Sequence, residues 1–145
     1  MTRPSKHTYF LEIASTVAKR STCARRQVGC VLVDQYDQIL ATGYNGVAKG
    51  LPHCTDEPCS GAGLPSGTGL SLCMAIHGEA NALIQCRAIN DIVTCYCTAS
   101  PCVNCIRMLL NTPCYSIVFL EEYPHPESRL LWESQGRKWI HYTGE

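Results

Sequence analysis

Two short segments carry residue types and spacings that could bind a metal ion and move protons. They are HGE at 77–79 and PCVNC at 101–105. A Cys-x-x-Cys pair at the start of a helix places both sulfurs on one side of its first turn, where free N–H groups and the helix dipole favour thiolate. With His77 as a third ligand, a tetrahedral zinc ion keeps one position open for water, which is typical of catalytic zinc. We therefore expect His77, Cys102 and Cys105 to hold a catalytic zinc ion.

Glu79 is the candidate proton carrier beside that ion. Residues two apart on a helix do not share a face, so Glu79 should project beside the metal rather than onto it. Zinc lowers the pKa of a bound water towards 7, and a carboxylate at this place could accept and return its proton. A Cys-x-x-Cys pair alone would also suit a redox pair or an ordinary core, but both interpretations leave His77 and Glu79 unexplained. A decayed, purely structural zinc site would not require Glu79.

Composition and charge narrow the function classes. The chain has 145 residues, and its 12 basic and 12 acidic residues give a formal net charge of zero. This argues against long nucleic acid as a partner, because such binding needs a basic surface. The apolar runs are too short for a membrane span, and the N-terminal MTRPSKHTYF lacks the apolar core of a signal peptide. We expect no membrane partner, a cytoplasmic location and one domain spanning residues 1–145.

The elements that must position the two segments follow from hydrophobic periodicity. Helices are expected at about 7–20, 75–88, 102–110 and 127–135, and strands at 28–33, 39–44, 92–98, 115–120 and 139–142. The first two strands read as a hairpin, and strands and helices alternate after it. This order predicts an α/β fold, namely a three-layer α/β/α sandwich with a mixed five-stranded sheet. The two chemical segments then open successive helices.

The paired motifs identify a family resemblance. H-x-E with P-C-x-x-C is the pattern of zinc nucleobase deaminases. The chain resembles the deoxycytidylate (dCMP) deaminases of the cytidine deaminase superfamily from about residue 21 to 123. The matching segments are STCARRQVG at 21–29, TGYNG at 42–46, HGEANA at 77–82 and SPCVNC at 100–105, with a weaker match at 122–123. Gly78 stands where the family usually has alanine, and we expect little functional change from it.

The resemblance implies an activity and a substrate site. The activity is zinc-dependent hydrolysis of dCMP to dUMP and ammonia, which supplies dUMP for thymidylate synthesis, on a cytidine deaminase-like fold. Asn45 would bond the substrate sugar, although Tyr-Asn-Gly is also good turn chemistry. The peptide at Ser100 would face the leaving amino group. Tyr123 would lie near the phosphate or an effector, or simply pack at a strand end. Candidate cations for the phosphate are Arg25, Arg26 and Lys49.

Regulation is also implied by the resemblance alone. Members of this family often form hexamers that are activated by dCTP and inhibited by dTTP. We therefore expect a homo-oligomer, with Mg²⁺ accompanying a bound effector. The expected effector-binding residues are Gly43, Tyr44 and Gly46.

Eleven cysteines without a signal peptide indicate metal ligands or core thiols rather than a disulfide framework. Some members of the resembling family hold a structural zinc with residues from the long loop at about 46–73 and from the segment before the first strand. The expected set is Cys23, Cys54, Cys59 and Cys73, with His53 as a substitute for one of them. The alternative is free thiols in the loop. The thiols expected in the core are Cys30, Cys86, Cys95, Cys97 and Cys114.

Two other functions stay open at this point. One is a deaminase acting on another cytosine compound, such as dCTP, CMP, cytidine or a base in nucleic acid. The neutral charge argues against nucleic acid, and TGYNG at 42–46 argues against cytidine. The other is a non-catalytic zinc-binding regulatory subunit, against which the intact Glu79 argues.

Overall fold

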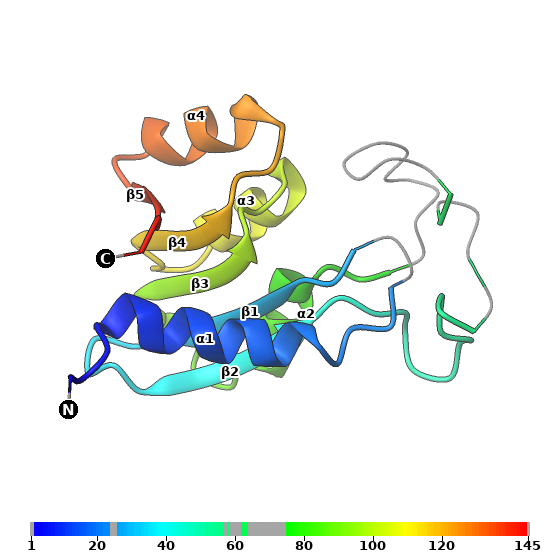
Figure 1. Ribbon diagram of the computed structural model, residues 1–145. Helices are drawn as coiled ribbons and strands as arrows, with labels where there is room; N and C mark the ends of the chain where they lie inside the picture. The colour runs from blue at the N-terminus through cyan, green and yellow to red at the C-terminus, as the bar shows by residue number, and fades with distance from the viewer. Residues whose placement is uncertain (1, 24–25, 57, 59–61, 64–74, 145) are drawn as a thin grey trace.

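The computed structural model describes residues 2–23, 26–56, 58, 62–63 and 75–144 (Figure 1). Its helices are α1 (Lys6–Ala18), α2 (Gly78–Gln85), α3 (Val103–Leu110) and α4 (Pro126–Ser134), with a short 3-10 turn at Ile89–Asp91. Its strands are β1 (Gly29–Val33), β2 (Ile39–Tyr44), β3 (Thr94–Ala99), β4 (Ser116–Glu121) and β5 (Lys138–His141). None of the described helices is long and apolar enough to cross a membrane.

The strands form one mixed sheet in the order β2-β1-β3-β4-β5. β1 runs antiparallel to both β2 and β3, while β3, β4 and β5 run parallel to one another. The parallel pairs are joined through α3 and α4, as parallel strands require a crossover. The expected mixed five-stranded sheet is confirmed.

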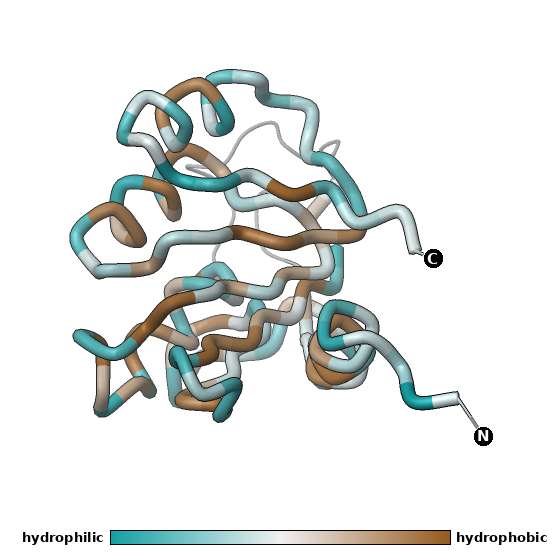
Figure 2. The backbone as a smooth tube through the Cα atoms, turned by 90° about the vertical axis from the view of Figure 1, so that its left-hand side faces the viewer, coloured by the Kyte–Doolittle hydropathy of each residue, from teal (hydrophilic) through white to brown (hydrophobic). Residues whose placement is uncertain are grey.

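Alternating side chains of β1 divide the core into two clusters, because successive residues of a strand point to opposite faces. Val31 and Val33 pack with residues of α1 on one face, whereas Cys30 and Leu32 pack with residues of α2, α3 and α4 on the other. Figure 1 shows α1 in front of the sheet and α2 and α3 behind it. Figure 2 shows hydrophobic stretches along strands in the middle of the molecule and on parts of the helices. The layers are therefore α/β/α, as expected.

Two glycines let helices lie directly on the sheet. A Cβ at Gly29 would stand 2.0 Å from the carbonyl oxygen of Ala14 in α1. A Cβ at Gly43 would stand 2.3 Å from the backbone nitrogen of Ala82 in α2. Since real Cβ atoms do not come so close to backbone, β2 can hold α2 at this distance only with glycine at 43. The same contact fixes where the start of α2 lies.

Arg137 secures the far end of α3. Its guanidinium donates hydrogen bonds to backbone carbonyls in and just after the last turn of the helix, and it lies 5.1 Å from the centroid of the Trp132 ring. The accepting carbonyls belong to Leu109, Leu110, Thr112 and Cys114. A helix leaves its last carbonyls without intrahelical partners, so one arginine satisfies several of them at once. This anchors the helix whose other end carries the Cys-x-x-Cys segment.

Candidate metal centre and active site

Two neighbouring helix starts bring the three expected zinc ligands together. His77 is the residue directly before α2, Cys102 is the residue directly before α3, and Cys105 lies in the first turn of α3. Nδ1 of His77 lies 3.4 Å from Sγ of Cys102 and 3.4 Å from Sγ of Cys105. All three ligand atoms lie within 4.8 Å of one another. The expected helix starts at 75 and 102 therefore fall slightly later, because His77 and Cys102 are extended capping residues.

The spacing of these atoms fits a tetrahedral zinc ion. With Zn–S bonds of about 2.3 Å and Zn–N bonds of about 2.0 Å, a ligand nitrogen and a ligand sulfur lie about 3.5 Å apart. The two observed N···S distances of 3.4 Å agree with this value. One imidazole and two thiols are also ligand types that zinc prefers, and three of them leave one position for water or substrate.

The two thiols of the centre differ in how easily they lose a proton. A hydrogen bond from Cys105 is the largest cause that lowers the pKa of Cys102, to about 4, and a hydrogen bond from His77 lowers it further against burial. Conversely, donating to Cys102 raises the pKa of Cys105 well above its usual range, and burial raises it further. Cys102 would therefore bind a cation as thiolate, and Cys105 would have to lose its proton to join it as a ligand.

Glu79 is buried beside this group. The residue is 4% exposed, and its carboxyl group raises the pKa of the Cys105 thiol. Burial is the largest cause that raises the pKa of Glu79 from 4.5 to about 7, the nearby Cys95 raises it further, and His77 lowers it. A carboxyl group with this pKa can both accept and donate a proton at neutral pH. The site thus combines a metal-ligand set with a group suited to acid–base catalysis.

Asn45 is buried and holds the turn after β2 to the segment before β1. Its Oδ1 accepts a hydrogen bond from the Val28 N–H at 2.8 Å, and its Nδ2 donates to the Arg26 carbonyl at 2.6 Å. The hydroxyl of Ser21 donates to the Asn45 carbonyl at 2.8 Å. The side chain therefore has the turn role that its sequence context indicates. An amide can donate two and accept two bonds, so it can also serve a substrate.

Asn81 is a positioning residue that the sequence analysis missed. Its Nδ2 donates to the carbonyls of Tyr44, at 2.8 Å, and Ile76, at 3.3 Å. Backbone hydrogen bonds between Gly46 and Ile76 tie the same two segments together. Asn81 thus joins the end of TGYNG to the start of α2. Its place four residues after His77, inside HGEANA, was the available signal.

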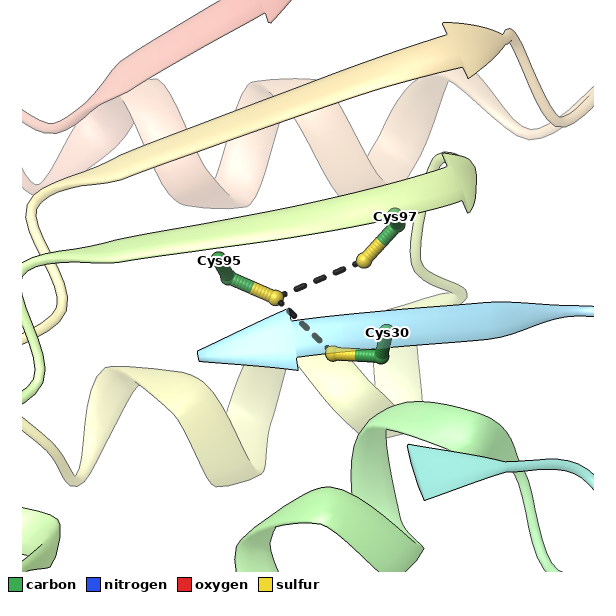
Figure 3. Close-up of side chains that lie close together, drawn as sticks. All are labelled: Cys30, Cys95 and Cys97. Atoms are coloured by element: carbon green, nitrogen blue, oxygen red, sulfur yellow. Dashed lines mark hydrogen bonds between the residues drawn. The ribbon is translucent and has the colours of Figure 1, made fainter. Parts of the chain in front are cut away.

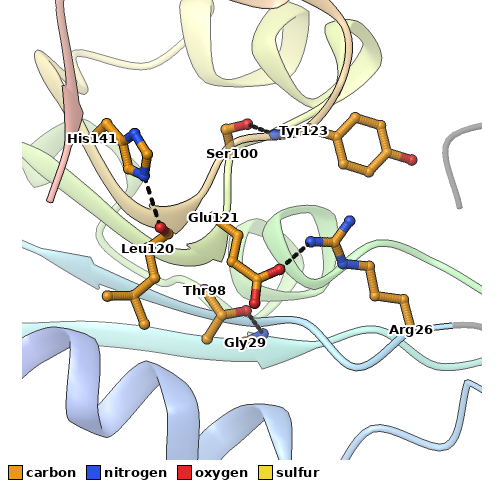
Figure 4. Close-up of polar contacts among 8 residues, drawn as sticks. All are labelled: Arg26, Gly29, Thr98, Ser100, Leu120, Glu121, Tyr123 and His141. Carbon is orange, nitrogen blue, oxygen red and sulfur yellow. Dashed lines mark hydrogen bonds and ion pairs between the residues drawn. The ribbon is translucent and has the colours of Figure 1, made fainter. Parts of the chain in front are cut away.

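Three further predicted residues meet at the end of β4 (Figure 4). The hydroxyl oxygen of Ser100, a buried residue, accepts a hydrogen bond from the Tyr123 N–H at 2.6 Å. The Arg26 guanidinium donates to the Glu121 carboxylate at 2.8 Å and lies 5.5 Å from the centroid of the Tyr123 ring. Glu121 is a charged partner of Arg26 that the sequence analysis did not single out. Lys49 is exposed, and Arg25 lies outside the described residues.

The second expected zinc site is described only in part. Cys23 and Cys54 are both buried, while Cys59 and Cys73 lie outside the described residues. The segments around the first two are neighbours, because the Thr55 N–H donates to the Thr22 carbonyl at 3.0 Å and Nδ1 of His53 lies 3.1 Å from the Thr22 hydroxyl. The second site therefore stays a prediction.

The expected effector residues lie around the same turn. Gly43 packs against α2, Tyr44 is half-buried and Gly46 is buried. Gly43 has a structural reason to be glycine, as the contact with Ala82 shows.

The chain is similar in sequence to a deaminase family and to several proteins named deoxycytidylate deaminase. A family model described as "Cytidine and deoxycytidylate deaminase zinc-binding region" matches residues 4–121. A deoxycytidylate deaminase of Mycobacterium phage D29 is 36% identical over 129 residues, which cover 84% of this chain and 99% of that protein. The deoxycytidylate deaminase of Schizosaccharomyces pombe is also 36% identical, over 83% of this chain but only 38% of its own length. The chain thus spans about two fifths of that fungal relative.

The fold has a close counterpart among solved structures. The dCMP deaminase of cyanophage S-TIM5, solved in complex with dCMP and dUMP, matches with a TM-score of 0.72 at 22% identity. The match covers 98% of this chain and all of the cyanophage chain. At this identity the likeness establishes the fold.

Proposed function

Because the chain belongs to the cytidine and deoxycytidylate deaminase family, we propose that it hydrolyses dCMP to dUMP and ammonia. His77, Cys102 and Cys105 are the proposed zinc ligands, and Glu79 is the proposed general acid and base. The observation that carries this proposal is the buried Glu79 carboxyl beside a ligand group with zinc spacing. The names of the relatives support dCMP as the substrate.

The mechanism rests on proton transfers through Glu79. When bound, zinc would lower the pKa of a water towards 7, so that the water can lose a proton and act as a nucleophile at neutral pH. Glu79 accepts a proton as oxygen adds to C4 of the cytosine, and gives a proton to N3. It then takes the second proton from the oxygen added at C4 and delivers it to the amino group, so the C4–N bond breaks, C4 becomes a carbonyl and ammonia leaves. Burial serves both roles, because a pKa of about 7 lets the carboxyl accept and release protons at neutral pH.

Substrate binding is proposed at the edges of this centre. Asn45 would bond the sugar with the donor and acceptor positions that its two backbone contacts do not use. The peptide at Ser100, immediately before the Cys-x-x-Cys segment, would face the leaving amino group. Arg26 would bind the 5′-phosphate, which would compete with Glu121 for the guanidinium. Its contact with the Tyr123 ring supports this assignment by placing both predicted residues together.

A substrate panel tests the proposed activity. Zinc-loaded protein should convert dCMP with a higher kcat/KM than CMP, dCTP or cytidine, followed as loss of the cytosine absorbance. Arg26→Ala should raise KM for dCMP by about tenfold or more, since a charge-assisted bond contributes roughly 1.5–3 kcal/mol, and should leave deoxycytidine kinetics unchanged. The matched control is Lys49→Ala, which removes an exposed cation and should change neither the KM for dCMP nor the kinetics with deoxycytidine. A preference of the native protein for cytidine over dCMP would contradict the phosphate assignment. An equal loss of activity on deoxycytidine in Arg26→Ala would contradict it as well.

We also propose a second, structural zinc held by Cys23, Cys54, Cys59 and Cys73, with His53 as a substitute. Four thiolates close a tetrahedral shell. The backbone contact between the segments around Cys23 and Cys54, and the burial of both thiols, support it. Native protein should contain about two zinc ions per chain, and Cys54→Ser about one. Elemental analysis that finds one zinc in protein never exposed to chelator would rule out the second site alone.

The remaining proposals concern organisation and regulation. Residues 1–145 are proposed as one deaminase domain, because all five described strands share one sheet. Thiol ligands need a reducing compartment, so a cytoplasmic location is proposed. The family resemblance supports a hexamer activated by dCTP and inhibited by dTTP with Mg²⁺, near Gly43, Tyr44 and Gly46. Initial-rate curves measured with dCTP or dTTP test the regulation, and mass photometry tests the hexamer.

A further inference from the structure

Three cysteines outside the candidate active site form a compact thiol cluster in the core (Figure 3). Cys30 lies on β1, and Cys95 and Cys97 lie on β3. Sγ of Cys95 is 3.5 Å from Sγ of Cys30 and 3.4 Å from Sγ of Cys97. All three sulfurs lie within 4.8 Å of one another, and all three residues are completely buried.

Strand register brings these thiols together. Cys30 stands directly opposite Cys97 in the antiparallel pair of β1 and β3, and Cys95 is opposite Leu32. Residues two apart on a strand point to the same face, so all three thiols face the layer of α2, α3 and α4. The donors are held by the centre of the sheet, which makes their spacing rigid.

We propose that Cys30, Cys95 and Cys97 form a binding site for a trivalent thiophilic ion of the arsenite class. Three thiolates are soft ligands, which select soft ions over magnesium or calcium. A three-coordinate ion of this class is pyramidal, because its lone pair occupies the remaining direction. It therefore needs donors on one side only, as one face of a sheet provides.

Charge selects among the thiophilic ions. An uncompensated charge is costly in a fully buried place. Three thiolates with a monovalent or divalent ion would leave a net negative charge, whereas a trivalent ion makes the complex neutral. In the reaction As(OH)₃ + 3 RSH → As(SR)₃ + 3 H₂O, three As–O bonds and three S–H bonds break. Three As–S bonds form, the thiol protons leave as water, and no atom changes oxidation state.

The cluster lies next to the active-site layer but shares no ligand with it. Glu79 raises the pKa of Cys105 on one side, and Cys95 of the cluster raises the pKa of Glu79 on the other. The zinc ligands lie at helix starts and the cluster thiols lie on strands, so zinc loading can protect the first group and leave the second available. This separation makes a direct test possible.

The test measures arsenic and zinc together on the full, zinc-saturated chain. Folded protein is incubated with arsenite, and a second sample is refolded with zinc and arsenite so that burial cannot prevent entry. After gel filtration, we expect about one arsenic per chain with unchanged zinc in at least the refolded sample. X-ray absorption should show three sulfur neighbours. No retained arsenic in either sample, or arsenic with two sulfur neighbours, would overturn the proposal.

Variants identify the thiols responsible. Cys95→Ala should reduce retained arsenic by about tenfold or more, because loss of even an outer-shell partner weakens metal binding by about 10–100-fold. If Cys95→Ala does not fold, Cys30→Val gives the same expectation with a β-branched residue suited to the strand. The matched control is Cys86→Ala, a buried thiol outside the cluster, which should retain arsenic fully. Retention that survives loss of Cys95 or Cys30 but disappears in Cys54→Ser would place the arsenic in the loop and refute the cluster site.

Discussion

The protein contains two groups of three metal-type donors with nearly the same internal spacing. In the zinc group, His77 lies 3.4 Å from each of its two thiols; in the strand cluster, the closest sulfurs are 3.4 and 3.5 Å apart. The zinc group lies at helix N-termini, which stabilise thiolate, and has Glu79 beside it. The cluster lies on strands in the core, completely buried. Proximity of donors therefore does not distinguish a catalytic site, whereas a proton carrier and an open coordination position do.

The largest expected effect comes from removing the proposed proton carrier, Glu79, and leaving the three donors in place. Glu79→Gln should lower kcat on dCMP by about 10³-fold or more, because one group serves several proton transfers. Zinc content should stay at the native value, because the carboxyl is not a predicted ligand. Steady-state kinetics and elemental analysis on the same preparation measure both. A variant that keeps a tenth of the activity would show that another group moves the protons.

The next prediction compares two substitutions, each of which removes one sulfur donor from one of the two groups. Cys102→Ala should remove about one zinc per chain and abolish activity, since a catalytic zinc needs its three protein ligands. Cys97→Ala should keep zinc and activity, and should cost about 1–2 kcal/mol of unfolding free energy through the lost buried sulfur. Zinc analysis, the dCMP assay and urea unfolding separate the two. Equal loss of activity in both would erase the functional difference between the groups.

The comparison also explains what could be predicted from the sequence. The zinc group depends on short local spacings at helix starts, so HGE and PCVNC revealed it in the chain itself. The strand cluster depends on the pairing of Cys30 with Cys97, which are 67 positions apart in the numbering. Local patterns indicated only that these cysteines would be buried, which is confirmed. Their mutual contact follows from a strand register that no local spacing reveals.

Polar contacts between segments that are distant in the sequence were the other part that the sequence could not reveal. Helical periodicity and short apolar runs predicted the elements, and the alternation of strands with helices predicted the sheet and its layers. The Asn81 amide binds two carbonyls from separate segments, and Arg26 pairs with Glu121 across the fold. Such contacts depend on where main chains meet after folding. The TGYNG turn was predicted as both a turn and a ligand segment, and the contacts of Asn45 account for the turn.

The pH dependence of stability tests a third difference between the two groups, namely the buried carboxyl of Glu79 beside the first group. The folded protein raises the pKa of Glu79 from 4.5 to about 7 by burial, so between these pH values the folded state binds a proton that the unfolded chain has lost. Stability therefore falls as pH rises through this window, by about 3 kcal/mol in total. In zinc-free protein, Glu79→Gln should be neutral at pH 4.5 and stabilising at pH 8. Thermal unfolding at both pH values measures this.

A control and a contrary result define that experiment. Glu121→Gln changes an exposed carboxylate whose ion pair with Arg26 contributes little, so it should leave stability nearly unchanged at either pH. A Glu79→Gln gain of the same size at both pH values would mean that packing, rather than ionisation, determines the effect.

The smallest expected effect is at Gly78, which lies between the proposed zinc ligand His77 and Glu79. A Cβ there would stand 3.3 Å from the carbonyl oxygens of Gly43 and Val28, which requires a shift of a few tenths of an ångström. Replacing glycine also lowers the entropy of the unfolded chain, a gain of about 0.4–1 kcal/mol. The two effects oppose each other, so Gly78→Ala should change unfolding free energy by less than about 0.5 kcal/mol and leave activity intact.

The matched control is Gly43→Ala. Its Cβ would meet backbone of α2 at 2.3 Å, so this variant should lose about 3 kcal/mol or more of unfolding free energy. Urea unfolding and dCMP turnover of the two variants decide the point, and a large loss in Gly78→Ala would mean that the HGE segment tolerates no displacement from β2.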